Sequence, residues 1–242
     1  MADLRFWFDP VCPFAWMTSK WVRMVAARRD YEVEWRLISL RLLNAHVDYA
    51  AHFPPEYEAG HTAGLHLLRV ASRVRDEHGP EALARFYEAC GARVFETEGG
   101  SDPAQDTRAL AEHVLADAGL PRHLADALDE ADRDVVIQAE TDEALALTGK
   151  DVGTPILHFR PRGTGPDSGE GTAFFGPVIS RLPSEEKAAE LWDHVVGLAG
   201  FPGFAELKRS LRERPQLAAF GVPADAVGTQ EDWHGGSRRQ KR

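Results

Sequence analysis

The sequence predicts an α/β protein in which a β-α-β unit and a β-β-α unit enclose a block of helices. Short apolar runs of the kind found in buried strands lie near both ends of the chain, and a long stretch with helical spacing lies between them. Of the 242 residues, 43% are hydrophobic. That fraction is enough to bury a sizeable core without disulfide bonds.

The first unit follows from the N-terminal pattern. Residues 4–8 (LRFWF) form a buried-type strand, and Pro10 ends it because proline lacks a backbone donor. Apolar residues recur at helical spacing over 14–28, and alternation over 31–39 indicates a second strand. A strand, a helix and a strand within about 35 residues form a βαβ unit, so the two strands should be parallel.

The remaining elements follow in the same way. The stretch 57–150 is rich in Ala, Leu, Glu and Arg and predicts four or five helices. Strands at 156–159 and 172–175, joined by a turn-rich loop, predict an antiparallel hairpin. A helix should begin at Ser184, which can cap it, and a short helix should span 204–212.

This order of elements is the topology of the thioredoxin fold with an inserted helical domain. The expected divisions are a first half of the thioredoxin fold at 1–56, an inserted helical domain at 57–150 and a second half at 151–214. Periodicity fades after Pro215, and the chain ends in a basic cluster. Residues 215–242 are therefore expected to be a disordered tail.

Composition excludes several classes of function. The net charge of -10 argues against a nucleic-acid partner, and no apolar run is long enough for a membrane partner. The N-terminus lacks the features of a secretory signal, so a cytoplasmic location is expected. No Cys/His set has metal-ligand spacing, and no glycine-rich turn follows a strand. No metal, flavin or nicotinamide is therefore indicated.

The chain has two cysteines, and Cys12 lies where a strand gives way to a helix. Free backbone N–H groups and the positive end of the helix dipole favour a thiolate there. A buried cysteine acting as a small hydrophobe is the commoner case, but this position, followed by Pro13, favours a reactive sulfur with a lowered pKa. Cys90 lies on a predicted helix with nothing near it in sequence to activate it, so a structural role is expected.

The segment around Cys12, Asp9-Pro10-Val11-Cys12-Pro13-Phe14-Ala15-Trp16, resembles the active-site segment of DsbA-like proteins, whose pattern is Cys-Pro-x-Cys. Further segments resemble one branch of that family, the mycothiol-dependent nitroreductases and disulfide reductases of actinobacteria. They are WMTSKW from Trp16, DVGTP from Asp151, FFGPVIS from Phe174, LWD from Leu191 and FAELKR from Phe204. The resemblance covers nearly the whole chain up to about residue 215.

The resemblance implies an active site and its partners. Cys12 would be the nucleophile and Pro13 would tune it, while Thr154-Pro155, with a cis peptide bond, would lie opposite and align a partner. Phe14, Ala15 and Trp16 would line the cleft. Mycothiol, or another low-molecular-weight thiol, would be the co-substrate. The substrate would be a disulfide or a small electrophile such as a nitroaromatic or a quinone, and a homodimer stays open.

The sequence departs from the DsbA-like pattern at Ala15, where the second, resolving cysteine would stand. Four interpretations stay open. A second thiol molecule resolves the Cys12 adduct, Cys90 replaces the missing cysteine, the cleft has lost exchange chemistry, or Ala15 is an introduced trapping substitution. Two functional alternatives also stay open: a conjugating or isomerising enzyme like the kappa-class glutathione transferases, and a redox-inert binding or chaperone module.

Overall fold

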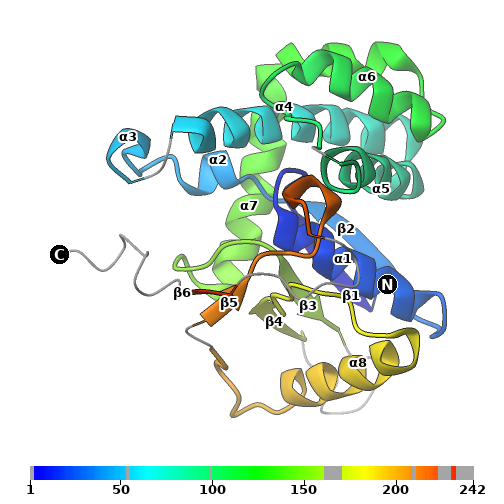
Figure 1. The fold of residues 1–242 in the computed structure, drawn as a ribbon, viewed down its shortest axis with the longest axis vertical. Helices are drawn as coiled ribbons and strands as arrows, with labels where there is room; N and C mark the ends of the chain where they lie inside the picture. The colour runs from blue at the N-terminus through cyan, green and yellow to red at the C-terminus, as the bar shows by residue number, and fades with distance from the viewer. Residues whose placement is uncertain are drawn as a thin grey trace.

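The computed structural model describes residues 3–52, 55–98, 100–160, 171–208, 211–222 and 230–232. Its central element is a four-stranded sheet in the order β2-β1-β3-β4 (Figure 1). The strands are β1 (Leu4–Phe8), β2 (Val33–Leu37), β3 (Ile156–Phe159) and β4 (Thr172–Phe175). β1 pairs with β2 in parallel and with β3 antiparallel, and β3 pairs with β4 antiparallel. The predicted βαβ unit and hairpin are thus confirmed, and together they form a thioredoxin fold.

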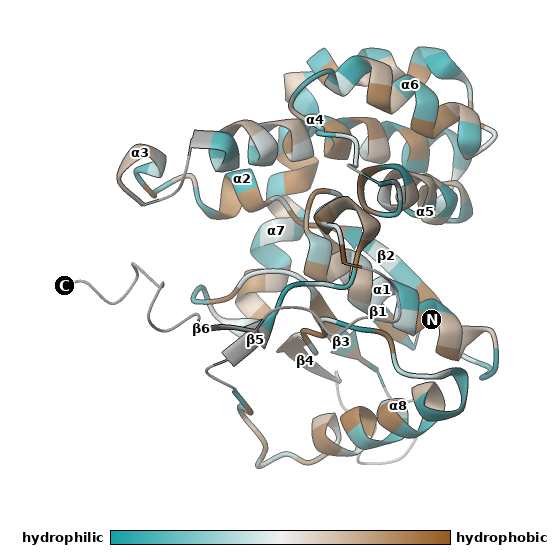
Figure 2. Cartoon of the chain, viewed as in Figure 1, coloured by the Kyte–Doolittle hydropathy of each residue, from teal (hydrophilic) through white to brown (hydrophobic). Residues whose placement is uncertain are grey.

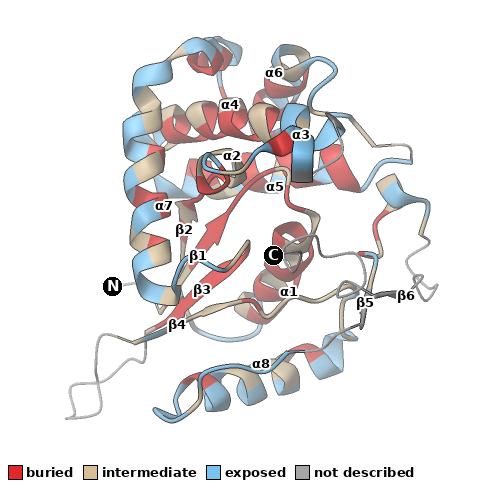
Figure 3. Ribbon diagram, turned by 90° about the vertical axis from the view of Figure 1, so that its left-hand side faces the viewer, coloured by how far each residue is buried: buried red, intermediate tan, exposed pale blue. Residues whose placement is uncertain are grey.

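Helices cover both faces of this sheet. α1 (Pro13–Ala26) packs against α8 (Glu185–Ala199), and α7 (Asp134–Thr148) contacts β2 and β4. α1 and α7 lie on opposite sides of the sheet in Figure 3. Side chains of β1 alternate accordingly, since Phe6 and Phe8 join the main core while Trp7 joins the small cluster beneath α7. Burial on both faces explains why LRFWF is apolar apart from Arg5, which is partly buried and pairs with Glu34 and Glu143.

The helical block lies beside one end of the sheet (Figure 1). It agrees with the four or five helices predicted for residues 57–150. Besides α7, the block and its approach comprise α2 (Leu40–Leu43), α3 (Tyr49–His52), α4 (Pro55–His78), α5 (Pro80–Phe95), α6 (Thr107–Asp117) and the 3-10 helices η1 (Arg122–Asp129) and η2 (Ala131–Arg133).

One main hydrophobic cluster includes strand residues such as Phe8 and Leu157 and block residues such as Leu67 and Phe86. The helices in Figure 2 carry hydrophobic residues on one side and hydrophilic residues on the other. The division into domains at 57 and 150 therefore stays a prediction.

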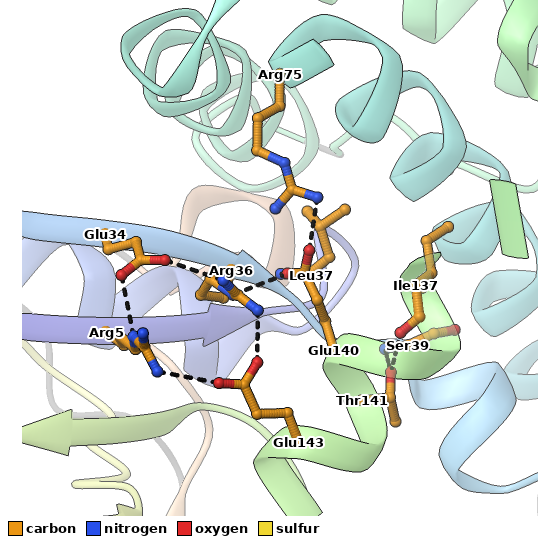
Figure 4. Close-up of polar contacts among 10 residues, drawn as sticks. All are labelled: Arg5, Glu34, Arg36, Leu37, Ser39, Arg75, Ile137, Glu140, Thr141 and Glu143. Atoms are coloured by element: carbon orange, nitrogen blue, oxygen red, sulfur yellow. Dashed lines mark hydrogen bonds and ion pairs between the residues drawn. The ribbon is translucent and has the colours of Figure 1, made fainter. Parts of the chain in front are cut away.

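A partly buried ionic network, centred on the buried Glu140, ties the block to the sheet (Figure 4). Glu140 of α7 accepts a hydrogen bond from the Leu37 amide at 2.8 Å, and its carboxylate lies 2.5 Å from Arg75 of α4 and 3.1 Å from Arg36 of β2. Arg36 also pairs with Glu143 at 2.5 Å. The network holds α4 and α7 against β2, the strand that leads into α2.

The region after α8 differs from the sequence prediction. Residues 204–208 form no helix, and β5 (Leu211–Glu213) pairs antiparallel with β6 (Gln230–Asp232). Leu207 is 81% exposed. Phe204 packs on Phe174 of β4, with the ring centroids 5.4 Å apart, so the two large apolar side chains described in this segment do not form one buried helical face.

Part of the segment expected to be a disordered tail also packs on the molecule. Leu217 is buried, and the 3-10 helix η3 (Ala218–Phe220) brings the Phe220 ring to 6.5 Å from that of Phe95 on α5. The rest of the tail prediction, 223–229 and 233–242, lies outside the described residues. Among the residues that the structure describes, no helix has the length and apolar character needed to cross a membrane.

Candidate functional site

Cys12 is the N-cap residue of α1. Its amide donates to the Asp9 carbonyl at 3.0 Å, so a tight turn carries the chain from β1 into the helix. Pro13 occupies the first turn, where a missing N–H has no effect on the helix ladder. The Ala15 amide donates to Cys12 Sγ at 3.4 Å. The structure thus places the sulfur at a helix N-terminus, as the sequence predicts.

The sheet brings Thr154 to the same place from far along the chain. β1 and β3 are antiparallel and Trp7 pairs with Ile156, so the residues that follow β1 and those that precede β3 lie side by side at the same end of the sheet. The Cys12 thiol donates to the Thr154 carbonyl at 3.6 Å. The Thr154-Pro155 peptide bond is cis, as expected. The relative exposures of Cys12 and Thr154 are only 6% and 5%, so the sulfur is closed off in this structure.

The Cys12 thiol does not have the lowered pKa expected from its position. Burial raises its pKa to about 11, with a smaller contribution from the negative charge of Asp9. The nearby Thr154 side chain and the hydrogen bond from the Ala15 amide act in the opposite direction and are outweighed. Cys12 is therefore a protonated thiol at neutral pH in this closed arrangement. The helix N-terminus could be found from sequence, but the burial that opposes it could not.

The expected cleft residues divide into two groups. Phe14 is half-buried and packs at the edge of the core, and Ala15 is buried beneath the sulfur. Trp16 differs from the prediction, because it is 4% exposed and its ring packs on Gly91 of α5 so closely that a Cβ there would overlap it. Its indole N–H donates to Glu96 at 2.7 Å. Trp16 therefore joins α1 to α5 and does not line the cleft.

Cys90 is fully buried on α5 and belongs to the main core. Burial raises its pKa to about 12. Both cysteines are free thiols in the structure. The surroundings of Cys90 agree with the structural role expected for it.

Asp9 is a residue of the site that sequence reasoning missed. Its side chain is 0% exposed, and its two oxygens accept from the Val11 amide at 3.0 Å and the Leu40 amide at 2.8 Å. Burial raises the pKa of this carboxyl to about 7. Because Asp9 precedes Pro10 in the sequence, it is interpreted there only as part of the turn that ends the strand. An acidic residue between a largely apolar strand and a cysteine was the available signal.

Two further observations bear on ligands. The Thr154 hydroxyl is buried and has no hydrogen-bond partner among the described residues, so it could pair with a polar group of a bound molecule. A cavity of about 360 Å³ lies along α1, lined in part by Met17, Lys20 and Glu96, but Cys12 is not among its lining residues. Within the described ranges, no group of three or more His, Cys, Asp or Glu side chains could hold a metal ion.

Known proteins resemble this chain over most of its length. A family model described as "Mycothiol-dependent nitroreductase Rv2466c" matches residues 11–209. The uncharacterized protein Rv2286c of Mycobacterium tuberculosis is 32% identical over 212 residues, which are 86% of this chain and 82% of that protein.

Two solved structures are more distant. One is a putative protein-disulfide isomerase from Pseudomonas syringae, with 16% identity, a TM-score of 0.43, and coverage of 78% of this chain and 92% of that one. The other is the probable DsbA oxidoreductase SCO1869 from Streptomyces coelicolor, with 16% identity, a TM-score of 0.47, and coverage of 90% and 98%. The match of the family model over residues 11–209, together with the mycobacterial relative, shows that this chain belongs to the Rv2466c-like family of mycothiol-dependent nitroreductases.

Proposed function

We propose that this protein is a thiol-dependent oxidoreductase in which Cys12 is the only sulfur that exchanges. One observation carries the proposal. Cys12 Sγ lies at the start of α1 between the Ala15 amide and the Thr154 carbonyl, while the position of a resolving cysteine holds Ala15. Cys90 is buried in the core and has a raised pKa, so it supplies no accessible second thiol.

The co-substrate is a low-molecular-weight thiol, and mycothiol is the candidate that family membership supports. It would supply the electrons and the second sulfur. In this chain, Cys12 would form the covalent adduct and the free Thr154 hydroxyl would pair with a polar group of the bound thiol. The second partner would be a disulfide or a small electrophile such as a nitroaromatic or a quinone. A homodimer and a cytoplasmic location stay predictions from the sequence.

The exchange can be written so that it balances. The Cys12 thiolate attacks one sulfur of a disulfide, a new S–S bond to Cys12 forms, and the other sulfur leaves as a thiolate. Attack by a second thiol then releases Cys12. For a nitroaromatic or a quinone, oxidation of two thiol molecules to one disulfide supplies two electrons and two protons. Pro13 and the Ala15 amide would keep Cys12 Sγ oriented towards the incoming sulfur.

The raised pKa of Cys12 sets a condition on this chemistry. Because burial is its largest cause, contact of the sulfur with water or with a polar substrate would lower the pKa towards the usual value of about 8.5. The Ala15 amide would then stabilise the thiolate further. Ionisation of Cys12 should therefore accompany binding and should be weak in the free protein.

The hydrogen bond that the Cys12 thiol donates favours a second candidate, a conjugating or isomerising enzyme of the kappa-class type. In that case Cys12 would donate to the sulfur of a bound thiol and would form no bond to it. A serine hydroxyl could replace that donor, whereas serine cannot replace an exchanging sulfur.

Turnover of a small aromatic disulfide with mycothiol tests the proposal. Cys12→Ser should abolish turnover, and Cys90→Ser should leave it within about twofold. Substantial activity in Cys12→Ser would contradict covalent exchange and support the second candidate. Loss of activity in a correctly folded Cys90→Ser protein would instead assign resolution to Cys90.

A further inference from the structure

The Asp9 carboxyl connects the elements that surround Cys12. Its two oxygens accept from the Val11 amide, in the turn that carries Cys12, and from the Leu40 amide at the start of α2. α4 approaches it closely, because a Cβ added at Gly64 would lie 2.8 Å from Asp9 Oδ1 and 2.7 Å from a Val11 methyl group. Asp9 is thus enclosed by backbone from three directions.

The charges near Asp9 make this burial unusual. The titratable groups that interact with its charge are Cys12, Cys90 on α5 and Tyr49 on α3, and each can only become negative. Arg41 of α2 stacks over the Tyr49 ring and pairs with Glu58. His61 of α4 is hydrogen-bonded to the Tyr49 hydroxyl, and burial lowers its pKa to about 4, so it is neutral. No cation pairs with Asp9 in the part of the chain that the structure describes.

A buried carboxylate with two amide donors and no cation is destabilised unless it can take up a proton. Burial accordingly raises the pKa of Asp9 to about 7, so that its two forms are both populated near neutral pH. The same charge raises the pKa of Cys12. Because both groups are buried, the repulsion between the two anions is screened little by solvent.

We propose that Asp9 is a positioning residue for Cys12, whose carboxylate holds the turn before the nucleophile and, when ionised, opposes formation of the Cys12 thiolate. The pKa of Asp9 is lower than that of Cys12, so near neutral pH the negative charge of the site lies on Asp9 and the Cys12 thiol is neutral. Ionised Asp9 thus adds to the burial that keeps Cys12 protonated, which protects a sulfur that lacks a resolving partner from oxidation. This inference rests on the proposed role of Cys12 as the reacting sulfur.

The test is the pH titration of Cys12 by ultraviolet thiolate absorbance in the full chain carrying Cys90→Ser. Asp9→Asn removes the charge and keeps an oxygen that can accept one of the two amides. Its Cys12 midpoint should fall by about half a pH unit, which is about threefold more thiolate at a given pH below the midpoint, because the Asp9 charge adds to a larger effect of burial. Asp106→Asn is the matched control, because Asp106 accepts the Ala109 amide at 2.9 Å as the cap of the distant helix α6. It should leave the midpoint unchanged.

A second measurement does not depend on the folding of a variant. The carboxyl-carbon NMR signal of Asp9 in the chain with Asp9 unchanged should titrate near pH 7. An ordinary midpoint near 4 would overturn the inference, as would an unchanged Cys12 midpoint in folded Asp9→Asn protein.

The two proposals fail in different ways. If Cys12→Ser abolishes turnover while Asp9→Asn leaves the Cys12 titration unchanged, only the inference about Asp9 is wrong. If Cys12→Ser retains turnover, the proposed function is wrong whatever the titration shows.

Discussion

Replacement of Asp9 by Asn should change the free energy of unfolding with a sign that depends on pH. The pKa of the Asp9 carboxyl is about 7 in the folded chain and 3.8 in the unfolded one. Folding therefore favours the protonated form. The stability that this group contributes is fully present below pH 3.8 and is lost as the pH rises to 7.

The magnitude follows from the difference between the two values. About three pKa units correspond to about 4 kcal/mol of stability lost between acid and mildly alkaline pH. No solvent discount applies, because the side chain is fully buried. Asn carries no charge and avoids this loss, but it can satisfy only one of the Val11 and Leu40 amides, which costs about 1–2 kcal/mol. Asp9→Asn should thus be about 2 kcal/mol more stable than the parent at pH 8 and about 1–2 kcal/mol less stable at pH 4.

Urea unfolding followed by tryptophan fluorescence at several pH values measures this difference. Trp7 and Trp21 are fully buried and should report loss of the core. Asp106→Asn should show a small difference from the parent that is the same at every pH. If Asp9→Asn lowered the free energy of unfolding by the same amount at every pH, the reasoning would be refuted, because ionisation of the buried Asp9 carboxyl would then not destabilise the folded protein.

Three other substitutions test separate parts of the structure. Gly91→Ala should lower the free energy of unfolding in urea by about 1–3 kcal/mol because the added Cβ would overlap Trp16. The control Gly197→Ala on α8, where an added Cβ has no atom within 4 Å, should be neutral or slightly stabilising. Equal effects of the two substitutions would contradict the packing of Trp16 on α5. Glu140→Gln should cost about 1–3 kcal/mol in the same assay, since the buried side chain loses the charge that Arg36 and Arg75 contact. A cost below about 0.5 kcal/mol would contradict the role of the network in holding α4 and α7 against β2. Ala15→Cys should shorten the lifetime of a Cys12 mixed disulfide in a mass-spectrometric time course, because a second thiol in the first turn of α1 can attack that disulfide and release its outer thiol. An unchanged lifetime would contradict the interpretation that the parent chain lacks only a resolving cysteine.

Local patterns were sufficient to predict the thioredoxin fold. The apolar run from Leu4 to Phe8, the helix after Pro13 and the pair of strands around 156–175 each carry their own signal, and their order determines the topology. The helix expected over 204–212 is wrong for residues 204–208 because helical spacing in a short segment has little stability unless its apolar residues share a buried face. Here Phe204 packs on Phe174, whereas Leu207 is exposed.

The position of the site could be predicted from the sequence, but the pKa values of its groups could not. The family resemblance placed Thr154 opposite Cys12, and the structure agrees, because Cys12 follows β1 and Thr154 precedes its antiparallel neighbour β3. The raised pKa of Cys12 depends on burial by elements distant in sequence, which no local pattern shows. The roles of Trp16 and Asp9 depend likewise on the close approach of α5 and α4, which Gly91 and Gly64 permit.

The most direct test of the central claim is the intact mass of the Cys90→Ser chain after exposure to mycothiol disulfide. We expect one mycothiol per chain, located on Cys12 by peptide mapping and removed by added mycothiol. A chain that turns over substrate with mycothiol but never carries the adduct would contradict covalent exchange at Cys12.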